Sequence, residues 1–248
     1  MLYHCIALQL GDFLSKLTRS LNLDIYRALA VLFMVIFHFT YDLNYFGFIE
    51  LKTTQSPFWI HFRTLIVTMF MSAVGMSFYI VYHESFHLKK YIKRLQLLGL
   101  TSLIISIVTY FIFPKSWIYF GVIHMIFLSS IIGPFFAKKP NISGVLGVGI
   151  IVLYLLGYRL TPLFELLQAP LYLPKYHTED LAPMIPWFGV ILLGIFAMHY
   201  KLIEVIKIKE SLFTKRVAFI GKHTLFIYLI HQVILFAILG AIAYLSKL

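Results

Sequence analysis

Four ionisable side chains share one face of a strongly hydrophobic segment, residues 23–43. At about 100° per residue on a helical wheel, the four fall within about 60° of one another: Asp24, Arg27, His38 and Asp42. From Asp24 to Asp42 a helix rises about 27 Å, nearly the thickness of membrane hydrocarbon. Charged groups are costly in lipid, so this stripe is expected to face partner helices or a water-filled path. For Asp24 and Arg27, an ion pair within the helix is an equal alternative.

His38 is the deepest of these residues, about five residues or about 7–8 Å from the predicted outer end of the segment. An imidazole titrates near neutrality and suits a general base. Asp42 is one helical turn away, where it could orient the ring or stabilise its charged form. The sequence therefore makes His38 and Asp42 candidates for acid–base chemistry.

Other hydrophobic segments carry ionisable residues at comparable depth. Arg63 in the second segment lies about as deep below the predicted outer end as His38 does in the first. His124 lies about 10 Å from the start of the fourth segment. These side chains are predicted to converge on one cavity; independent positions are the alternative, especially for Arg63, which can reach the interface. In the last segment Tyr228 and His231 share a face, and His231 is about 10 Å above the cytoplasmic end. His231 has two open roles: it could be a buried histidine bonded to a neighbouring helix, or it could bind a ligand.

The sequence also contains one zinc-like pattern, His83-Glu84-x-x-His87. On a helix this pattern places two ligands on one face, with the glutamate as general base. Here it falls where a hydrophobic segment ends, beside lysines, and a third ligand with suitable spacing is not evident. We therefore expect no metal.

The elements that carry these residues are predicted to be transmembrane helices. The chain of 248 residues is 60% hydrophobic and 12% charged, with a mean hydropathy of +0.88, whereas soluble domains are about 45–50% apolar and about 25% charged. This composition excludes a soluble globular enzyme. The expected fold is an all-α polytopic membrane bundle, with residues 1–22 as an N-terminal arm and 23–248 as a single domain. Its seven predicted spans are 23–43, 58–82, 95–113, 117–137, 141–158, 181–199 and 224–245.

Basic residues orient this bundle. Fourteen Lys and Arg fall on the side of the N-terminal arm and five on the other, which predicts a cytoplasmic N-terminus. The net charge of +11 is thereby explained without nucleic acid. The opening residues lack a basic region and a cleavage site, so no signal peptide is expected. The single cysteine, Cys5, excludes a disulfide framework.

Several short motifs, in order along the chain, resemble the membrane acyltransferase superfamily. The closest resemblance is to the bacterial branch that is similar to the heparan-alpha-glucosaminide N-acetyltransferase catalytic domain. The motifs are Leu23-Asp24-Ile25-Tyr26-Arg27-Ala28-Leu29-Ala30, Phe37-His38-Phe39, Phe120-Gly121-Val122-Ile123-His124, Pro186-Trp187-Phe188-Gly189, Gly221-Lys222-His223-Thr224 and Tyr228-Leu229-Ile230-His231-Gln232.

The resemblance implies transfer of an acyl group, expected to be acetyl, from cytoplasmic acetyl-CoA to a glycan or glycolipid at the outer face of a bacterial inner membrane. Arg27 and His38 match the Arg and His of the broader acyltransferase motif, where the His is catalytic. The predicted catalytic residues are His38, Asp42 and His124. Predicted substrate or CoA contacts are Asp24, Arg27, Arg63, Trp187, Tyr228, His231 and Gln232. A homodimer is left open.

The sequence departs from the family at several points. Ala28 replaces the usual Gly after Arg, and seven spans are fewer than the ten or eleven of well-known relatives. In the heparan enzyme the position matching His38 is Asn, and residues 39–57 here contain no His that could replace the one in the following loop of that enzyme. A proton-coupled small-molecule transporter, with the polar stripe as a relay, is the alternative function.

Overall fold

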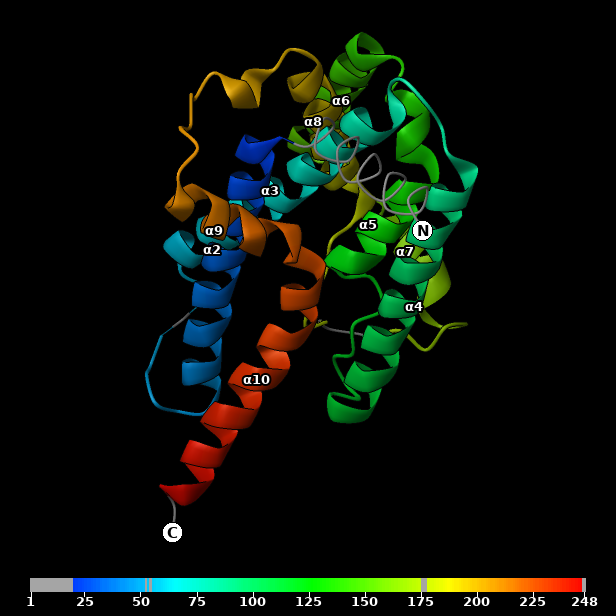
Figure 1. The fold of residues 1–248 in the computed structure, drawn as a ribbon. Helices are drawn as coiled ribbons and strands as arrows, with labels where there is room; N and C mark the ends of the chain where they lie inside the picture. Colours follow the sequence, from blue (N-terminus) through cyan, green and yellow to red (C-terminus); the bar gives the residue numbers. More distant parts are fainter. Residues whose placement is uncertain (1–19, 52, 54, 175–177, 247–248) are drawn as a thin grey trace, which may run out of the picture. The chain divides into compact units, whose positions relative to one another are not determined.

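The computed structural model describes residues 20–51, 53, 55–174 and 178–246. Within these residues it contains nine α-helices, two short 3₁₀ helices and no strand beyond one isolated bridge between Phe120 and Leu181 (Figure 1). The all-α prediction is therefore confirmed for the described part of the chain. The predicted N-terminal arm, 1–22, lies almost entirely outside the described residues.

Each of the seven predicted spans contains an apolar helix. Four helices are long and apolar enough to cross a membrane: α2 (Leu21–Tyr45), α3 (Pro57–Tyr82), α4 (Leu88–Ile112) and α10 (Thr224–Leu245). Three are shorter than the about 20 residues that a crossing needs: α5 (Val122–Ile132), which continues into η1 (Gly133–Phe136), α6 (Pro140–Leu155) and α8 (Met184–His199). Membrane helices are thus supported, whereas the count of seven spans and the cytoplasmic N-terminus stay predictions.

The helix boundaries depart from the predicted segments in three ways. α4 begins seven residues before the predicted start at 95, because its basic first turns continue the helix beyond the apolar stretch. Residues 117–121, predicted as helix, are not helical, and α5 begins only at Val122. Two short helices were not predicted, α7 (Thr161–Gln168) and α9 (Leu212–Lys222), because neither is long enough to register as a span.

The contacts divide the described chain into two compact units. We call residues 71–202 the central unit, and residues 20–70 with 203–246 the terminal unit. Helix α3 contributes residues to both. Each unit is described separately below.

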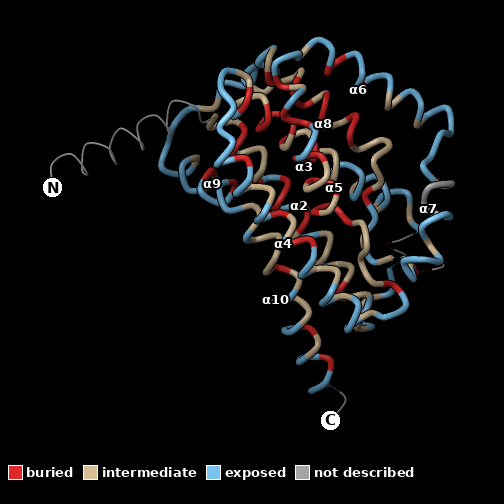
Figure 2. The backbone as a smooth tube through the Cα atoms, turned by 90° about the vertical axis from the view of Figure 1, so that its right-hand side faces the viewer, coloured by how far each residue is buried: buried red, intermediate tan, exposed pale blue. Residues whose placement is uncertain are grey.

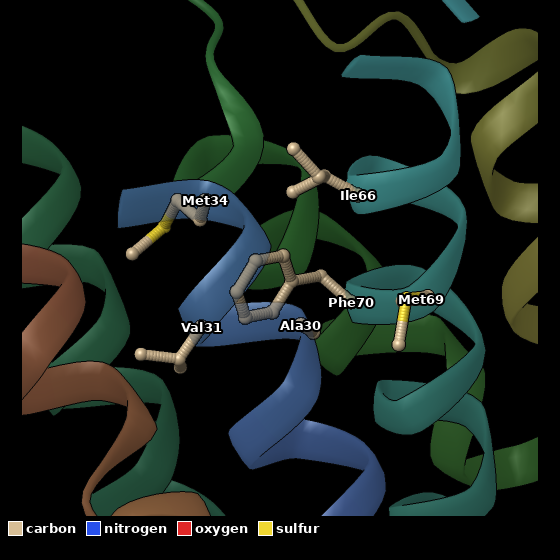
Figure 3. Packing of buried hydrophobic residues seen from close by; sticks show 6 residues of the cluster. All are labelled: Ala30, Val31, Met34, Ile66, Met69 and Phe70. Atoms are coloured by element: carbon tan, nitrogen blue, oxygen red, sulfur yellow. The ribbon is translucent and has the colours of Figure 1, made fainter. Parts of the chain in front are cut away.

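The core of the terminal unit lies between α2 and the first half of α3. Figure 3 shows its six buried residues, three from each helix, with the ring of Phe70 directed at α2: Ala30, Val31, Met34, Ile66, Met69 and Phe70. Each Val, Ile, Met or Phe side chain contributes about 1.5–3 kcal/mol to stability when it is fully buried. This packing fixes the rotation of α2 about its axis, and therefore fixes which face of α2 is left for α9 and α10.

Helices α9 and α10 both pack on α2. In Figure 1, α9 lies across the N-terminal end of α2, and α10 then runs down beside it. Gly221 of α9 sits so close to α2 that a Cβ would overlap the carbonyl oxygen of Asp24. At the far end, the ring of Phe236 on α10 packs against those of Tyr45 and Phe46 in tilted pairs, at centroid distances of 5.1 and 4.8 Å. These contacts hold α10 against the polar face of α2.

Close approaches between glycines organise the central unit. A Cβ on Gly75 of α3 would overlap the backbone of Ile191 on α8, and one on Gly194 would overlap Ser72 of α3. Gly147 of α6 meets α8 in the same way. Small residues let helix backbones approach, which is the usual basis of packing in membranes. Figure 2 shows the resulting burial in α8 and the largely exposed outer side of α6.

Candidate functional site

His38 lies in the terminal unit, on the face of α2 that meets α10. Its Nδ1 is 2.9 Å from the backbone carbonyl oxygen of Met34. A carbonyl only accepts hydrogen bonds, so Nδ1 must carry the proton. In the neutral ring Nε2 is then an unprotonated nitrogen, which is the form that a general base requires.

A second histidine, His231 of α10, contacts the first. The two ring centroids are 4.9 Å apart and the ring planes are inclined by 75°. Nδ1 of His231 lies 2.8 Å from the carbonyl oxygen of Tyr228 and 3.1 Å from that of Ile227, so this nitrogen also carries the proton. Its Nε2 is buried and has no hydrogen-bond partner among the described residues. The structure therefore presents two adjacent imidazoles, each with Nδ1 bound to its own helix and Nε2 directed elsewhere.

This contact corrects the predicted depths of the two histidines. The sequence placed His38 near the outer end of its helix and His231 only about 10 Å above the opposite end of α10. That estimate assumed that both helices begin at the same level. In the structure, α9 lies between them in sequence and packs on Asp24, so α10 starts well below the start of α2 (Figure 1). The two histidines are neighbours for this reason.

A carboxylate and an amide adjoin the histidine pair. Nε2 of Gln232 donates a hydrogen bond of 2.8 Å to Oδ1 of Asp42, which is fully buried. The other oxygens of this pair, Asp42 Oδ2 and Gln232 Oε1, are buried without partners among the described residues. Buried polar atoms are normally hydrogen-bonded, and leaving one unpaired costs about 1–3 kcal/mol. We call His38, Asp42, His231 and Gln232 the polar cluster.

All three unpartnered atoms of the polar cluster are acceptors: Asp42 Oδ2, Gln232 Oε1 and His231 Nε2. They are suited to a molecule that supplies N–H or O–H donors. The sequence predicted each cluster residue, but assigned His38 and Asp42 to catalysis and His231 and Gln232 to binding. It left two roles open for Asp42, to orient the ring of His38 or to stabilise its charged form. In the structure the Met34 carbonyl holds that ring, and Asp42 is bonded to Gln232.

Aromatic rings surround the polar cluster on α2 and α10. The ring of Phe37 meets His38 edge to face at 5.7 Å, and Tyr228 lies 5.9 Å from His231. Tyr228 also packs against Phe70 of the core at 6.5 Å. These rings pack against the histidine pair from the helices that carry it.

The remaining part of the α2 stripe is separate from the polar cluster. Arg27 Nη1 lies 3.0 Å from Oδ1 of Asp24, which is buried, and the two form an ion pair within the helix. Eleven residues separate Arg27 from His38, which corresponds to about 16 Å. The structure therefore shows the ion pair that the sequence left open, at the N-terminal end of α2.

Arg63 and Trp187, both predicted as substrate contacts, have no contact with the polar cluster within the terminal unit. Arg63 is exposed on α3 rather than buried with the cluster. Trp187 is half-buried on α8 in the central unit. The predicted convergence of Arg63 with His38 is therefore not what the terminal unit shows. A long side chain near a helix end reaches the surface at low cost. This agrees with the alternative interpretation, in which Arg63 reaches the membrane interface independently of His38.

His124, the other predicted base, has both ring nitrogens occupied within the central unit. Its Nδ1 accepts from the backbone N–H of Gly121 at 3.2 Å, and Nε2 lies 2.9 Å from the hydroxyl of Ser106. That hydroxyl donates to the carbonyl oxygen of Ile118 at 2.8 Å. The ring therefore closes the first turn of α5 and ties it to α4. This geometry assigns His124 a structural role and leaves it no free lone pair for catalysis.

Two acidic residues that the sequence analysis missed also stabilise the start of α5. Asp180 accepts from the N–H of Val122 at 2.8 Å, and Glu179 accepts from the hydroxyl of Ser116 at 2.5 Å. A carboxylate at a helix N-terminus is stabilising because it meets unpaired N–H groups and the positive end of the helix dipole. The sequence signal that could have identified them is the position of two adjacent acidic residues directly before the sixth apolar segment.

The zinc-like pattern does not form a helical face. α3 ends at Tyr82 and α4 begins at Leu88, so His83 and His87 lie in the non-helical connection. Nearby, the hydroxyl of Tyr79 is 2.8 Å from Nδ1 of His199. Across the described residues no group of three or more His, Cys, Asp or Glu could hold a metal ion.

A family model described as "Heparan-alpha-glucosaminide N-acetyltransferase, catalytic" matches residues 19–233, a range that includes the whole polar cluster. No curated protein and no solved structure matches the chain.

Proposed function

Because this chain belongs to the heparan-alpha-glucosaminide N-acetyltransferase catalytic family, as its motifs indicated, we propose that it transfers acetyl groups from acetyl-CoA to an amine or hydroxyl of a glycan or glycolipid. The family and the four long apolar helices indicate a membrane acetyltransferase in general. The observation that carries the assignment of the site is the histidine pair, with Nδ1 of each ring bound to backbone and Nε2 available as a base.

In the proposed reaction, Nε2 of His38 removes the proton from the acceptor N–H or O–H as that atom attacks the thioester carbonyl carbon. A C–N or C–O bond forms and the C–S bond breaks. The proton then passes from His38 to the departing sulfur, which gives the CoA thiol. A positioned acid–base group contributes about 10²–10⁴-fold to such a step.

The other members of the polar cluster support this step. The three unpartnered acceptor atoms would bind the donor groups of the acceptor substrate and fix its nucleophile beside His38. The carboxylate of Asp42 would also stabilise the imidazolium that forms, since opposite charges attract more strongly in a site without water. Tyr228 would shield the pair from solvent.

The phosphates of CoA require cations, and the start of α4 supplies them. Lys89, Lys90 and Lys93 are exposed there, and the half-buried guanidinium of Arg94 lies 5.3 Å from the centroid of the Phe78 ring. Arginine and lysine are the usual partners of phosphate. These residues stay candidates for contacts with the phosphates of CoA, and Asp24, Arg27, Arg63 and Trp187 stay candidates for further substrate contacts.

The proposal includes a topology. Seven spans with a cytoplasmic N-terminus in a bacterial inner membrane would place the α4 lysines on the side where acetyl-CoA is available, and the acceptor on the outer side. The charge distribution of the sequence supports this orientation.

Acetyl transfer by purified variants tests the proposed base. With acetyl-CoA carrying a 14C-labelled acetyl group and glucosamine as the acceptor probe, His38→Ala should lower the rate by about 10²–10⁴-fold. His61→Ala, which removes an exposed histidine of α3, serves as the matched control and should retain the rate. A folded His38→Ala protein with near-normal transfer would exclude His38 as the base.

A further inference from the structure

The short helix α9 presents an unusual outward face. Gly221 and Ala218 face α2, and Ala218 is 2% exposed. The opposite side carries four large apolar side chains that are between 43% and 73% exposed: Leu212, Phe213, Phe219 and Ile220. At about 100° per residue, Arg216 projects from the middle of these four, and it is exposed as well. We call these five residues the α9 outer face.

The position of this face is fixed by contacts on both sides of α9. The Ser211 hydroxyl caps the helix by accepting from the N–H of Thr214 at 3.1 Å. The segment before α9 is attached to α2, because the side-chain amide of Asn22 donates to the carbonyl oxygens of Ile203 and Ile206 at 2.9 and 2.8 Å. With Gly221 in contact with Asp24, the helix has little freedom to rotate. These contacts therefore fix which side of α9 is turned away from α2.

The charge around the α9 outer face is strongly positive. Residues 203–222 contain five Lys and Arg but only two Glu. One of the two glutamates, Glu210, is paired with Lys215 at 3.3 Å. Lys222, six residues after Arg216, is exposed as well. An exposed apolar face with a central arginine and neighbouring lysines matches a surface that combines acyl chains with phosphate.

The geometry points to an anionic phospholipid bound on the α9 outer face, with Arg216 on its phosphate and Phe213 and Phe219 among its acyl chains. Amphipathic helices with basic residues lie in the membrane interface in this way, with the apolar side about 5–10 Å deep. Figure 1 shows α9 crosswise to α2 and α10, which is the orientation of an interfacial helix beside spanning ones. Guanidinium binds phosphate through two parallel hydrogen bonds, which suits arginine to this position.

Lipid binding by the purified full chain tests this inference. In detergent, added dioleoylphosphatidylglycerol should raise the melting temperature and remain bound in native mass spectra, whereas dioleoylphosphatidylcholine should do neither. Arg216→Gln should weaken retention of the anionic lipid about fivefold, the effect of one basic residue near a charged surface. Arg216→Lys should restore part of it. Lys115→Gln, which removes an exposed cation outside α9, is the control and should bind as the unmodified chain does.

Other outcomes would overturn the inference. Equal lipid retention by the Arg216→Gln and Lys115→Gln proteins would remove Arg216 from the site. Equal stabilisation by phosphatidylcholine would show that charge is irrelevant. Equal stabilisation by inorganic phosphate would indicate a phosphate site without acyl chains. A change of oligomeric mass in Arg216→Gln, with unchanged lipid retention, would instead indicate that a second copy of the chain covers the face.

Discussion

Replacing His124 should lower stability and spare chemistry, the reverse of the effect at His38. His124→Ala removes the acceptor of the Gly121 N–H, which is buried, and the partner of the Ser106 hydroxyl. An unpaired buried donor costs about 1–3 kcal/mol and a lost neutral hydrogen bond about 0.5–1.5 kcal/mol. Together these give a loss of about 1.5–4.5 kcal/mol. For a chain of this size that corresponds to a fall of about 3–18 °C in melting temperature.

Two conservative comparisons make this prediction specific. His124→Asn retains an acceptor oxygen near the Gly121 N–H and should recover part of the lost stability. Ser106→Ala removes the two hydrogen bonds of its hydroxyl, with His124 and with the Ile118 carbonyl oxygen, and should cost about 1–3 kcal/mol. Melting curves by intrinsic fluorescence, together with acetyl transfer per folded molecule at a temperature below every transition, give both quantities. An unchanged melting temperature with a loss of transfer above about 10²-fold would refute the structural role and return His124 to catalysis.

Two further substitutions test the terminal unit. Asp42→Asn keeps the hydrogen bond from Gln232 but removes the charge beside the histidine pair. Acetyl transfer at saturating acetyl-CoA should therefore fall about 10–100-fold. An unchanged rate would show that the charge is not needed. Gly221→Ala places a Cβ against the Asp24 carbonyl oxygen and should lower the melting temperature through an overpacking cost of about 1–3 kcal/mol, whereas Gly149→Ala, where a Cβ meets nothing within 4 Å, should not. Equal melting temperatures for these two variants would contradict the close packing of α9 on α2.

The residues of the polar cluster could be selected from the sequence because polar and ionisable side chains are rare within membrane-spanning segments. His38 and Asp42 stand out in an apolar segment, and His231 and Gln232 do so in the last one. Their pairing could not be predicted, because the level at which α10 starts depends on how α9 packs. That packing depends on the absence of a side chain at Gly221, which hydropathy does not register.

His124 shows why burial of an ionisable residue does not by itself indicate catalysis. Its position in an apolar segment resembles that of His38. The difference lies in the partners of the two rings: His38 Nδ1 is bound within its own helix, which leaves Nε2 available, whereas His124 is bound at both nitrogens by Gly121 and Ser106. Ser106 lies on a different helix, so only the tertiary structure reveals this contact.

The central claim is that acetyl transfer takes place beside Nε2 of His38. A structure of the His38→Asn protein with acetyl-CoA, determined by electron cryomicroscopy in nanodiscs, tests this claim most directly. The substitution removes the base and retains a polar side chain, so the thioester should remain intact. Our account predicts its carbonyl carbon within about 7 Å of the residue 38 side chain, because the acceptor nucleophile would lie between them, about 3–3.5 Å from each. A thioester bound next to His124, or away from both α2 and α10, would contradict it.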